Sequence, residues 1–395
     1  MSKTAKPTKP QKASDEAQTS LKQILLVPAY AVLSGLIIGA IAILASGGNV
    51  LEAYGALFTG SFGIPSRFVD GFQQFFSTGE TAGLLKAIYP FTESLVTATP
   101  YIFGGLAVAL GFRCGLFNIG AEGQFFIGAL CSAFVGYSIK GIPFYIHLPL
   151  ALLAGAAGGA LWGTVPGFLK ARFGAHEVVN TIMMNWIAFR LSDWLLNGPM
   201  KASGFRPVTP NVQVTAELPR FFPDPLRLNW GFILALITAY VVYWFLFKTT
   251  IGFEIRSVGA NPDAAKYAGM SIVRNLVLVM ALSGGLAGLA GTSQVLGVDH
   301  WVGQGFSAGY GFDSIALALL GKSHPFGVVI AALLFGFLRS GATRMQSMAG
   351  IPIDIISVIQ GLIIIFIAAP DIIRWLYRLR AVKADQAVLT RGWGK

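Results

Sequence analysis

The segment GLFNIGAEGQFFIG, residues 115–128, places three hydrogen-bonding side chains between strongly apolar stretches: Asn118, Glu122 and Gln124. A carboxylate in hydrocarbon is costly unless it is protonated or paired, so such a residue suggests a functional site. The glycines of the segment would let the backbone break, and a broken segment facing a cavity can offer polar groups to a solute. Alternatively, Glu122 caps the start of an apolar helix at the membrane boundary. Both interpretations stay open at this point.

A second polar group lies in HEVVNTIMMNWIAF, residues 176–189. Asn180 and Asn185 could face a solute pathway, with Trp186 supplying a stacking surface. Hydrogen bonding between neighbouring helices explains the two asparagines at least as well. Asp313, which begins another apolar segment, is better explained as a helix cap than as a solute contact.

Motifs of enzyme chemistry fail on inspection. ALALLGKS, residues 316–323, approaches a phosphate-binding loop, but Ala316 replaces the first glycine and the intervening residues are apolar. HEVVN begins like a zinc-protease helix and lacks the second histidine, and the four histidines of the chain show no metal-ligand spacing. We therefore predict a chain that is no enzyme, holds no metal and binds no cofactor directly.

The elements that must position these residues are membrane helices. The chain has 395 residues, of which 54% are hydrophobic and only 12% charged. Residues 24–45 carry no charge over 22 positions, enough to span a bilayer. The sequence predicts an all-α polytopic membrane protein with about ten transmembrane segments, some of them broken or re-entrant. The predicted segments are 24–45, 87–111, 121–138, 147–170, 178–196, 229–247, 272–296, 310–321, 325–338 and 354–370.

Flanking charge predicts the orientation. Lysines crowd residues 1–23, and arginines and lysines crowd residues 371–395, so the positive-inside rule places both termini in the cytoplasm. We interpret these two ranges as basic cytoplasmic tails, the first of them disordered, around a permease domain over 24–370. Residues 46–86 and 197–228 then lie outside, although four cations in the second range weaken the rule there.

Four stretches together resemble the permease subunits of nucleoside-type ABC importers, within the branched-chain amino-acid and simple-sugar permease superfamily. They are GLFNIGAEGQFFIGA, HEVVNTIMMNWIAF, GANPDAAKYAGM and GYGFDSIALALLG, and the resemblance runs from about residue 24 to 370. It implies a multi-pass protein of the bacterial cell membrane that pairs with a second, often non-identical permease subunit. It also implies a cytoplasmic ABC ATPase that hydrolyses ATP and an extracytoplasmic lipoprotein that delivers the solute.

The third stretch lies in a predicted cytoplasmic segment, residues 248–271. Asn261 and Pro262 favour a helix start, and a short helix ending at Gly269 should follow. In the family this helix resembles the coupling helix that docks into the ATPase; the alternative is an ordinary amphipathic loop. The residues assigned to coupling are Gly259, Asn261, Pro262, Ala264, Ala265 and Gly269.

Three other functions compete with nucleoside import. The same kind of permease could carry ribose-like sugars or another small polar solute. An ion- or proton-coupled secondary carrier could use Glu122 as a proton relay, and it would work without an ATPase. A purely structural membrane subunit would not need the polar residues at membrane depth.

Overall fold

The computed structural model describes residues 11–378, and this part of the chain is helical, with no β-strand in it. The first helices are α1 (Gln11–Ala45), α2 (Val50–Phe62), α3 (Pro65–Thr78), α4 (Ala82–Arg113), α5 (Ala121–Ser138), α6 (Phe144–Phe173) and α7 (Glu177–Asn197). After a long connection with one turn of 3₁₀-helix follow α8 (Trp230–Lys248), α9 (Thr250–Ala260), α10 (Pro262–Tyr267), α11 (Ile272–Gln294) and the π-helical η2 (Val295–Asp299). The last are α12 (Tyr310–Leu320), α13 (Pro325–Ala349), α14 (Asp354–Ala368) and α15 (Pro370–Leu376).

Each of the ten predicted apolar segments corresponds to a helix. Five helices within the described residues are both long and apolar enough to cross a membrane: α4, α6, α8, α11 continued through η2, and α13. The apolar parts of α1, α12 and α14 are shorter. The helical class and the membrane character are therefore confirmed, while the count of ten spans stays a prediction.

The structure differs from the prediction at both ends of the permease domain. Helix α1 begins at Gln11, so residues 11–23 are helical although we assigned them to a disordered tail. Helix α15 begins at Pro370, so the predicted C-terminal tail starts inside a helix. The remainder of both tails lies outside the described residues.

Residues 46–86, which we placed outside the membrane, contain α2 and α3 and the start of α4. Helix α2 packs against α13, where the Ser61 hydroxyl donates a hydrogen bond to the Phe337 carbonyl at 2.6 Å. At 13 residues it is too short to register as a membrane span by length. Segments 310–321 and 325–338 were the short segments for which we predicted half-helices or a re-entrant pair. Only α12 is short, at about 16 Å; α13 extends to Ala349 and has 25 residues.

Small residues bring the central helices into close contact. A Cβ atom placed on Gly159 of α6 would lie 2.2 Å from the Gly284 carbonyl oxygen of α11, so no side chain fits there. A Cβ on Gly128 of α5 would lie 2.3 Å from the Cα of Gly288 of α11. Backbones in a membrane approach closely only where side chains are small, so these glycines allow α5, α6 and α11 to pack closely.

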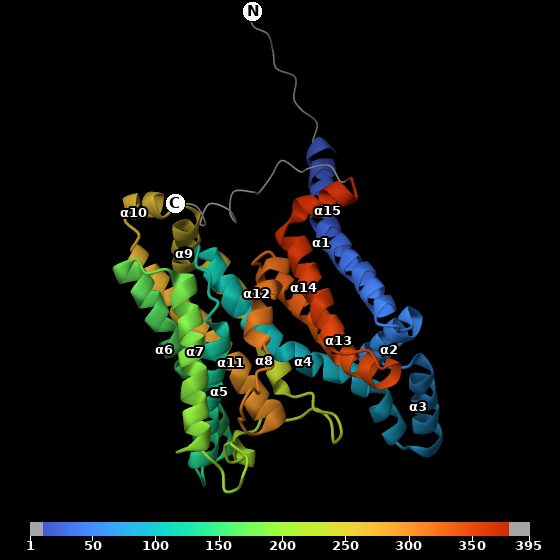
Figure 1. The fold of residues 1–395 in the computed structure, drawn as a ribbon. Coiled ribbons are helices and arrows are strands. Elements are labelled where there is room, and N and C mark those ends of the chain that lie inside the picture. The colour runs from blue at the N-terminus through green and yellow to red at the C-terminus, as the bar shows by residue number, and fades with distance from the viewer. Residues whose placement is uncertain (1–10, 379–395) are drawn as a thin grey trace, which may run out of the picture.

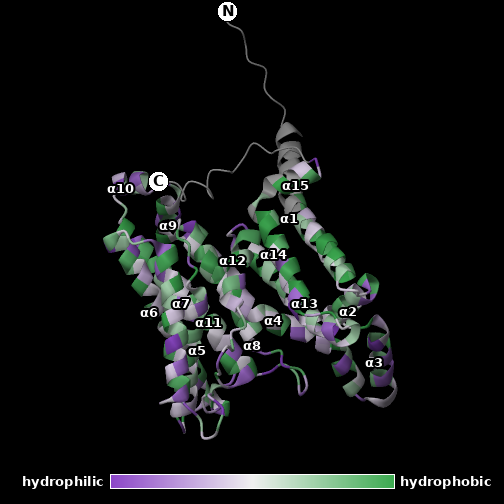
Figure 2. Cartoon of the chain, viewed as in Figure 1, coloured by the Kyte–Doolittle hydropathy of each residue, from purple (hydrophilic) through white to green (hydrophobic). Residues whose placement is uncertain are grey.

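The helices form two groups joined by α4 (Figure 1). One group contains α5, α6, α7 and α11, and the other contains α1, α2, α3, α13 and α14; α4 contacts members of both groups. Helices α10 and α15 lie at one end of the molecule. The helices α1 and α14 pack on each other, and both α14 and the apolar part of α1, Ala29–Ala45, are strongly hydrophobic (Figure 2). The polar side chains of interest lie where the groups meet, around α12.

Candidate functional site

The polar segment interrupts the helices well inside the protein. Residues 114–120 are not helical, and α5 begins only at Ala121. The Gln124 amide lies 3.2 Å from the position of a Cβ atom on Gly163 of α6. Gly163 is ten residues before the end of α6 at Phe173, or about 15 Å along its axis. The broken backbone predicted from the glycines is therefore present; it begins at the exposed Gly115, beside Gly259 of α9, and becomes buried at Asn118 and Gly120.

Asn118 and Gln124 bond to each other and to α11. The Asn118 amide donates to the Gln124 side-chain oxygen at 2.8 Å and to the Ser283 hydroxyl at 2.7 Å. Gln124 donates back to Asn118 at 3.3 Å, and Ser283 donates to the Ala107 carbonyl at 2.6 Å. None of the three side chains is more than 1% exposed. These amides thus join α4, the broken segment, α5 and α11.

Glu122 caps a helix other than its own. Its carboxylate accepts hydrogen bonds from the backbone N–H of Gly311 at 2.7 Å and of Phe312 at 3.3 Å, and from the Ser307 hydroxyl. Gly311 and Phe312 are in the first turn of α12, whose free N–H groups attract a negative charge. Glu122 stands in the first turn of α5, as the capping alternative expects, but the backbone N–H groups that its carboxylate caps are those of α12.

Asn185 joins the same group from α7. Its side-chain oxygen accepts from the Gly123 N–H at 2.9 Å, and its amide donates to the Ile119 carbonyl at 3.0 Å. We call Asn118, Glu122, Gln124, Asn185 and Ser283 the buried polar hub, since each is at most 3% exposed. Interhelical bonding thus accounts for Asn185. Whether any hub residue contacts a solute in another conformation stays a prediction.

Asn180 and Trp186, which the sequence also predicted to face a solute pathway, lie outside the hub. Trp186 is 56% exposed on an outer apolar face of α7 beside Ile187, with its ring edge against Phe189. Asn180 is half-buried, and its amide nitrogen is buried without a hydrogen-bond partner among the described residues. The structure therefore does not bring Asn180 and Trp186 together with Asn118, Glu122 and Gln124.

A charged group that the sequence prediction missed lies beside the hub. The Arg339 guanidinium of α13 donates to the Tyr101 hydroxyl at 2.6 Å and to the Asp313 carboxylate at 3.2 Å. Tyr101 of α4 donates to the same Asp313 oxygen at 2.7 Å, and Arg339 also donates to the Ala308 carbonyl at 2.7 Å. The guanidinium lies 4.8 Å from the ring centre of Tyr310. We call Tyr101, Asp313 and Arg339 the open charged cluster.

The residues of this cluster are visible in the sequence, but the predicted helix ended too early to include Arg339. Our ninth segment ends at residue 338, one position before Arg339, so the arginine lay outside the predicted helix. In the structure α13 continues to Ala349, which places Arg339 inside the helix. The sequence favoured a helix cap over a solute contact for Asp313, and Tyr101 stands in a stretch that gives no hint of a polar role.

A second ion pair lies on the same side of α4. Arg227, in the long connection before α8, forms a salt bridge with Glu93, with 40% and 18% of the side chains exposed. Burial of the Arg227 guanidinium disfavours its charge, but the hydrogen bond and the charge of Glu93 outweigh this, so the pKa of Arg227 is raised. Two of the four outer cations are thus paired, since Arg220 also contacts Asp224 at 2.6 Å.

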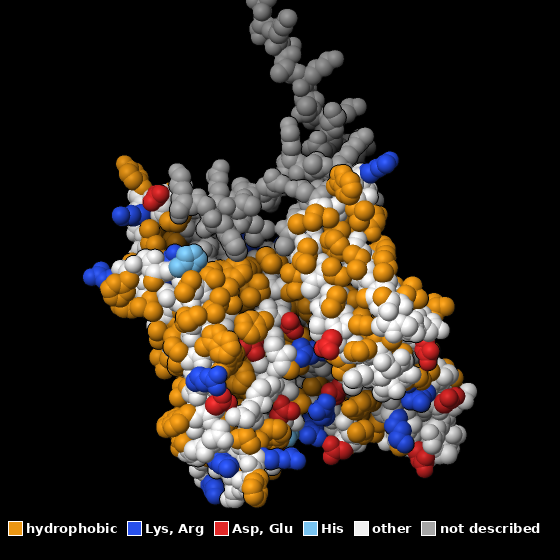
Figure 3. Space-filling view, viewed as in Figure 1, with side chains coloured by type: hydrophobic (Ala, Val, Ile, Leu, Met, Phe, Trp, Pro, Cys, Tyr) orange, Lys and Arg blue, Asp and Glu red, His pale blue; other side chains and the backbone are white. Residues whose placement is uncertain are grey.

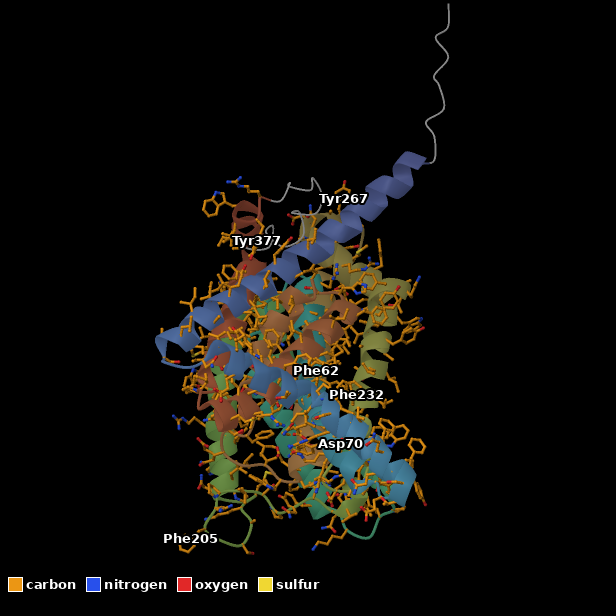
Figure 4. The ribbon with its side chains drawn as sticks, turned by 90° about the vertical axis from the view of Figure 1, so that its right-hand side faces the viewer. Phe62, Asp70, Phe205, Phe232, Tyr267 and Tyr377 are labelled. Atoms are coloured by element: carbon orange, nitrogen blue, oxygen red, sulfur yellow. The ribbon has the colours of Figure 1, made fainter. Side chains whose placement is uncertain are left out.

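The predicted coupling segment folds as a short helix. The Asn261 side chain accepts from the N–H groups of Asp263 and Ala264, both at 3.1 Å, and Pro262 occupies the first turn of α10. Gly269 follows the helix with a φ of 82°. The predicted start and end are confirmed, and Figure 4 shows Tyr267 at the opposite end of the molecule from Phe205.

The coupling residues divide into an inner and an outer set. Ala265 is 3% exposed, and a Cβ on Gly259 would lie 2.2 Å from the Arg113 carbonyl of α4. These two positions hold α9 and α10 against the bundle. Asn261, Pro262, Ala264 and Gly269 are exposed, as is the Tyr267 side chain at 98%.

Comparison with known proteins places the chain in a family of membrane permeases. Residues 91–368 match the family described as branched-chain amino acid transport system / permease component, and the chain belongs to it. It is 41% identical to the guanosine ABC transporter permease protein NupP of Bacillus subtilis, over 89% of this chain and 95% of that protein. It is 35% identical to the nucleoside ABC transporter permease protein NupB of Lactococcus lactis, over 93% and 97% of the two chains.

Another relative has a different solute in its name. The chain is 32% identical to the glucose ABC transporter permease protein TsgB13 of Haloferax volcanii, over 87% of each chain. No solved structure matches the chain. The family match and these relatives show that the chain is an ABC permease subunit, a transport component and not an enzyme.

Proposed function

We propose that this permease forms the translocation pathway of an ATP-driven importer for nucleosides. The observation that carries the proposal is the similarity, over nearly the full length of both chains, to permeases named for guanosine and nucleosides. The hydrogen-bonding side chains buried among the described residues agree with a hydroxyl-bearing solute.

The importer needs further subunits. We propose a second, non-identical permease, a cytoplasmic ABC ATPase and an extracytoplasmic substrate-binding lipoprotein, in a bacterial cell membrane. Support for the ATPase comes from α10, whose outer residues Pro262, Ala264 and Tyr267 project from one end of the bundle. Exposed aromatic side chains on a rigid support are typical anchors of protein interfaces.

The orientation follows from the same helix. If α10 meets the ATPase, its end of the molecule is cytoplasmic, and α15 lies at that end as well. The connection between α7 and α8, which contains Phe205, then lies outside. This agrees with ten spans and two cytoplasmic termini.

We propose that the buried polar hub shapes this pathway by holding its walls. Four of its residues connect the broken segment and α5 to α7, α11 and α12, and the fifth, Ser283, connects α11 to α4. Such bonds fix the position of α12 relative to the rest. A direct contact of Asn118, Glu122 or Gln124 with the solute would require the hub to open.

Uptake in cells tests the proposal. A bacterial strain lacking its own nucleoside importers is given this chain together with candidate second permease, ATPase and binding-protein subunits. We expect ATP-dependent uptake of labelled guanosine that unlabelled nucleosides compete away and glucose does not. Abolition of uptake by a mutation in the ATPase Walker lysine separates the importer from an ion-coupled carrier.

A sugar importer is the second candidate, because a relative of nearly full length is named for glucose. The same strain then takes up labelled glucose or ribose, and guanosine does not compete. Uptake of guanosine by the permease alone in liposomes, driven by a proton gradient, would instead establish a secondary carrier.

A further inference from the structure

The open charged cluster has hydrogen-bonding groups on one side that no described residue uses. The Asp313 and Arg339 side chains are 31% and 28% exposed, whereas Tyr101 behind them is fully buried. Asp313 uses one carboxylate oxygen, Oδ2, for both of its hydrogen bonds. The other oxygen, Oδ1, accepts none from the described residues, and Arg339 has N–H groups beyond those that bond Tyr101, Asp313 and Ala308.

Arg339 is a charged residue inside α13, a helix long and apolar enough to cross a membrane. Arg339 is the fifteenth residue of the 25-residue α13, well away from both of its ends. Charged groups inside membrane proteins face cavities or the bundle interior, because exposure to lipid is costly. Figure 3 shows acidic and basic side chains gathered near the middle of one face, between the two groups of helices. Because the Arg339 and Asp313 side chains are partly exposed, the open side of the cluster faces outward from the packed core.

The cluster is held rigidly in place. The Tyr101 hydroxyl bonds both charged groups, the Ala308 carbonyl holds the guanidinium, and the Tyr310 ring packs against the Tyr101 ring at 4.7 Å. Asp313 follows directly on the two α12 residues whose N–H groups Glu122 caps. A carboxylate oxygen and guanidinium N–H groups are thus presented together and preorganised, which lowers the cost of binding.

This pair fits one kind of ligand surface. A vicinal diol has two adjacent hydroxyls, each of which can donate and accept; one can donate to the carboxylate while the other accepts from the guanidinium. Hydrogen bonds to charged groups are stronger than those between neutral groups. We propose that Asp313 and Arg339 bind the vicinal diol of the solute, which in a nucleoside is the 2′,3′-diol of the ribose. The proposal rests on the proposed function and deepens it.

The test compares solutes that differ in one hydroxyl. In the complete importer, unlabelled guanosine and 2′-deoxyguanosine compete for uptake of labelled guanosine, with uptake normalised to inserted, folded protein. We expect guanosine to compete about tenfold or more better than the deoxy form, as loss of a charge-assisted hydrogen bond predicts. Asp313→Asn and Arg339→Gln should reduce that preference to about twofold or less, while Tyr101→Phe reduces it in part.

Two further variants serve as a control and as a substitute. Asp193→Asn removes a carboxylate from an exposed ion pair on α7 and should keep the full preference for guanosine. Arg339→Lys keeps the charge and loses the planar fork, so it carries the test if Asp313→Asn does not insert. Guanosine uptake with no preference over the deoxy form, or variants that slow both solutes equally, overturns this inference and leaves the proposed function standing. Absence of all nucleoside uptake by the native importer overturns the proposed function, and this inference with it.

Discussion

The buried polar hub and the open charged cluster lie side by side at the start of α12, yet they differ in how far their side chains are exposed. In the hub, side chains from the broken segment, α5, α7 and α11 bond to each other or to backbone, and none is more than 3% exposed. In the cluster, Asp313 and Arg339 keep nearly a third of their side chains exposed. Residues that are conspicuous in the sequence thus build the framework, and less conspicuous ones remain available to a solute.

The hub and the cluster differ because their polar groups find different numbers of hydrogen-bond partners within the protein. A buried polar group must find hydrogen bonds within the protein, so a segment rich in such groups satisfies itself once the helices close around it. A charged pair held by one tyrosine and one carbonyl keeps spare capacity. Several substitutions can break or sharpen this contrast, and they are taken from the largest expected effect to the smallest.

Gly311→Ala should damage the hub most. A Cβ at Gly311 would lie 2.4 Å from the backbone nitrogen of Glu122, so α12 would have to move away from its cap. Overpacking of this kind costs about 1–3 kcal/mol or more. We expect a clear fall in the thermal unfolding midpoint of the detergent-solubilised protein. The control is Gly361→Ala in α14, where a Cβ meets nothing within 4 Å and the midpoint should stay or rise.

Asn118→Ala should lower stability by a similar or smaller amount and leave transport intact. It leaves Gln124 and Ser283 buried with one partner fewer, at a cost of about 1–3 kcal/mol. We expect a lower unfolding midpoint with guanosine uptake per folded molecule within about twofold of the native value. An unchanged midpoint combined with a large loss of uptake would assign Asn118 to solute contact.

Helix α10 offers the same contrast between buried and open positions. Tyr267→Ala removes an exposed ring and should leave the unfolding midpoint unchanged while it weakens ATPase docking, by about 2 kcal/mol if Tyr267 is a hot spot. Ala265→Leu changes a buried position and should lower the midpoint instead. The measurements are thermal unfolding and binding of the purified ATPase to the permease. Full ATPase affinity in Tyr267→Ala would remove α10 from the interface.

Local sequence signals predicted local structure well. Asn261, Pro262 and Gly269 marked α10 because capping and turn chemistry depend on neighbouring residues alone. The break before α5 was visible for the same reason. The partner of Glu122 could not be predicted, since the cap of α12 is formed by a residue nearly 190 positions away in the chain. The open charged cluster likewise unites α4, α12 and α13, and its recognition needed the true length of α13.

The contrast between hub and cluster is tested most directly by thiol labelling in the assembled importer. Cys114 and Cys131 are first replaced by Ala, and single cysteines are then introduced as Asp313→Cys and Gln124→Cys. With an impermeant thiol reagent applied from outside, we expect the cysteine at position 313 to react and guanosine to protect it. The cysteine at position 124 should stay unlabelled in the folded protein. Labelling and guanosine protection at position 124, with none at position 313, would contradict the account.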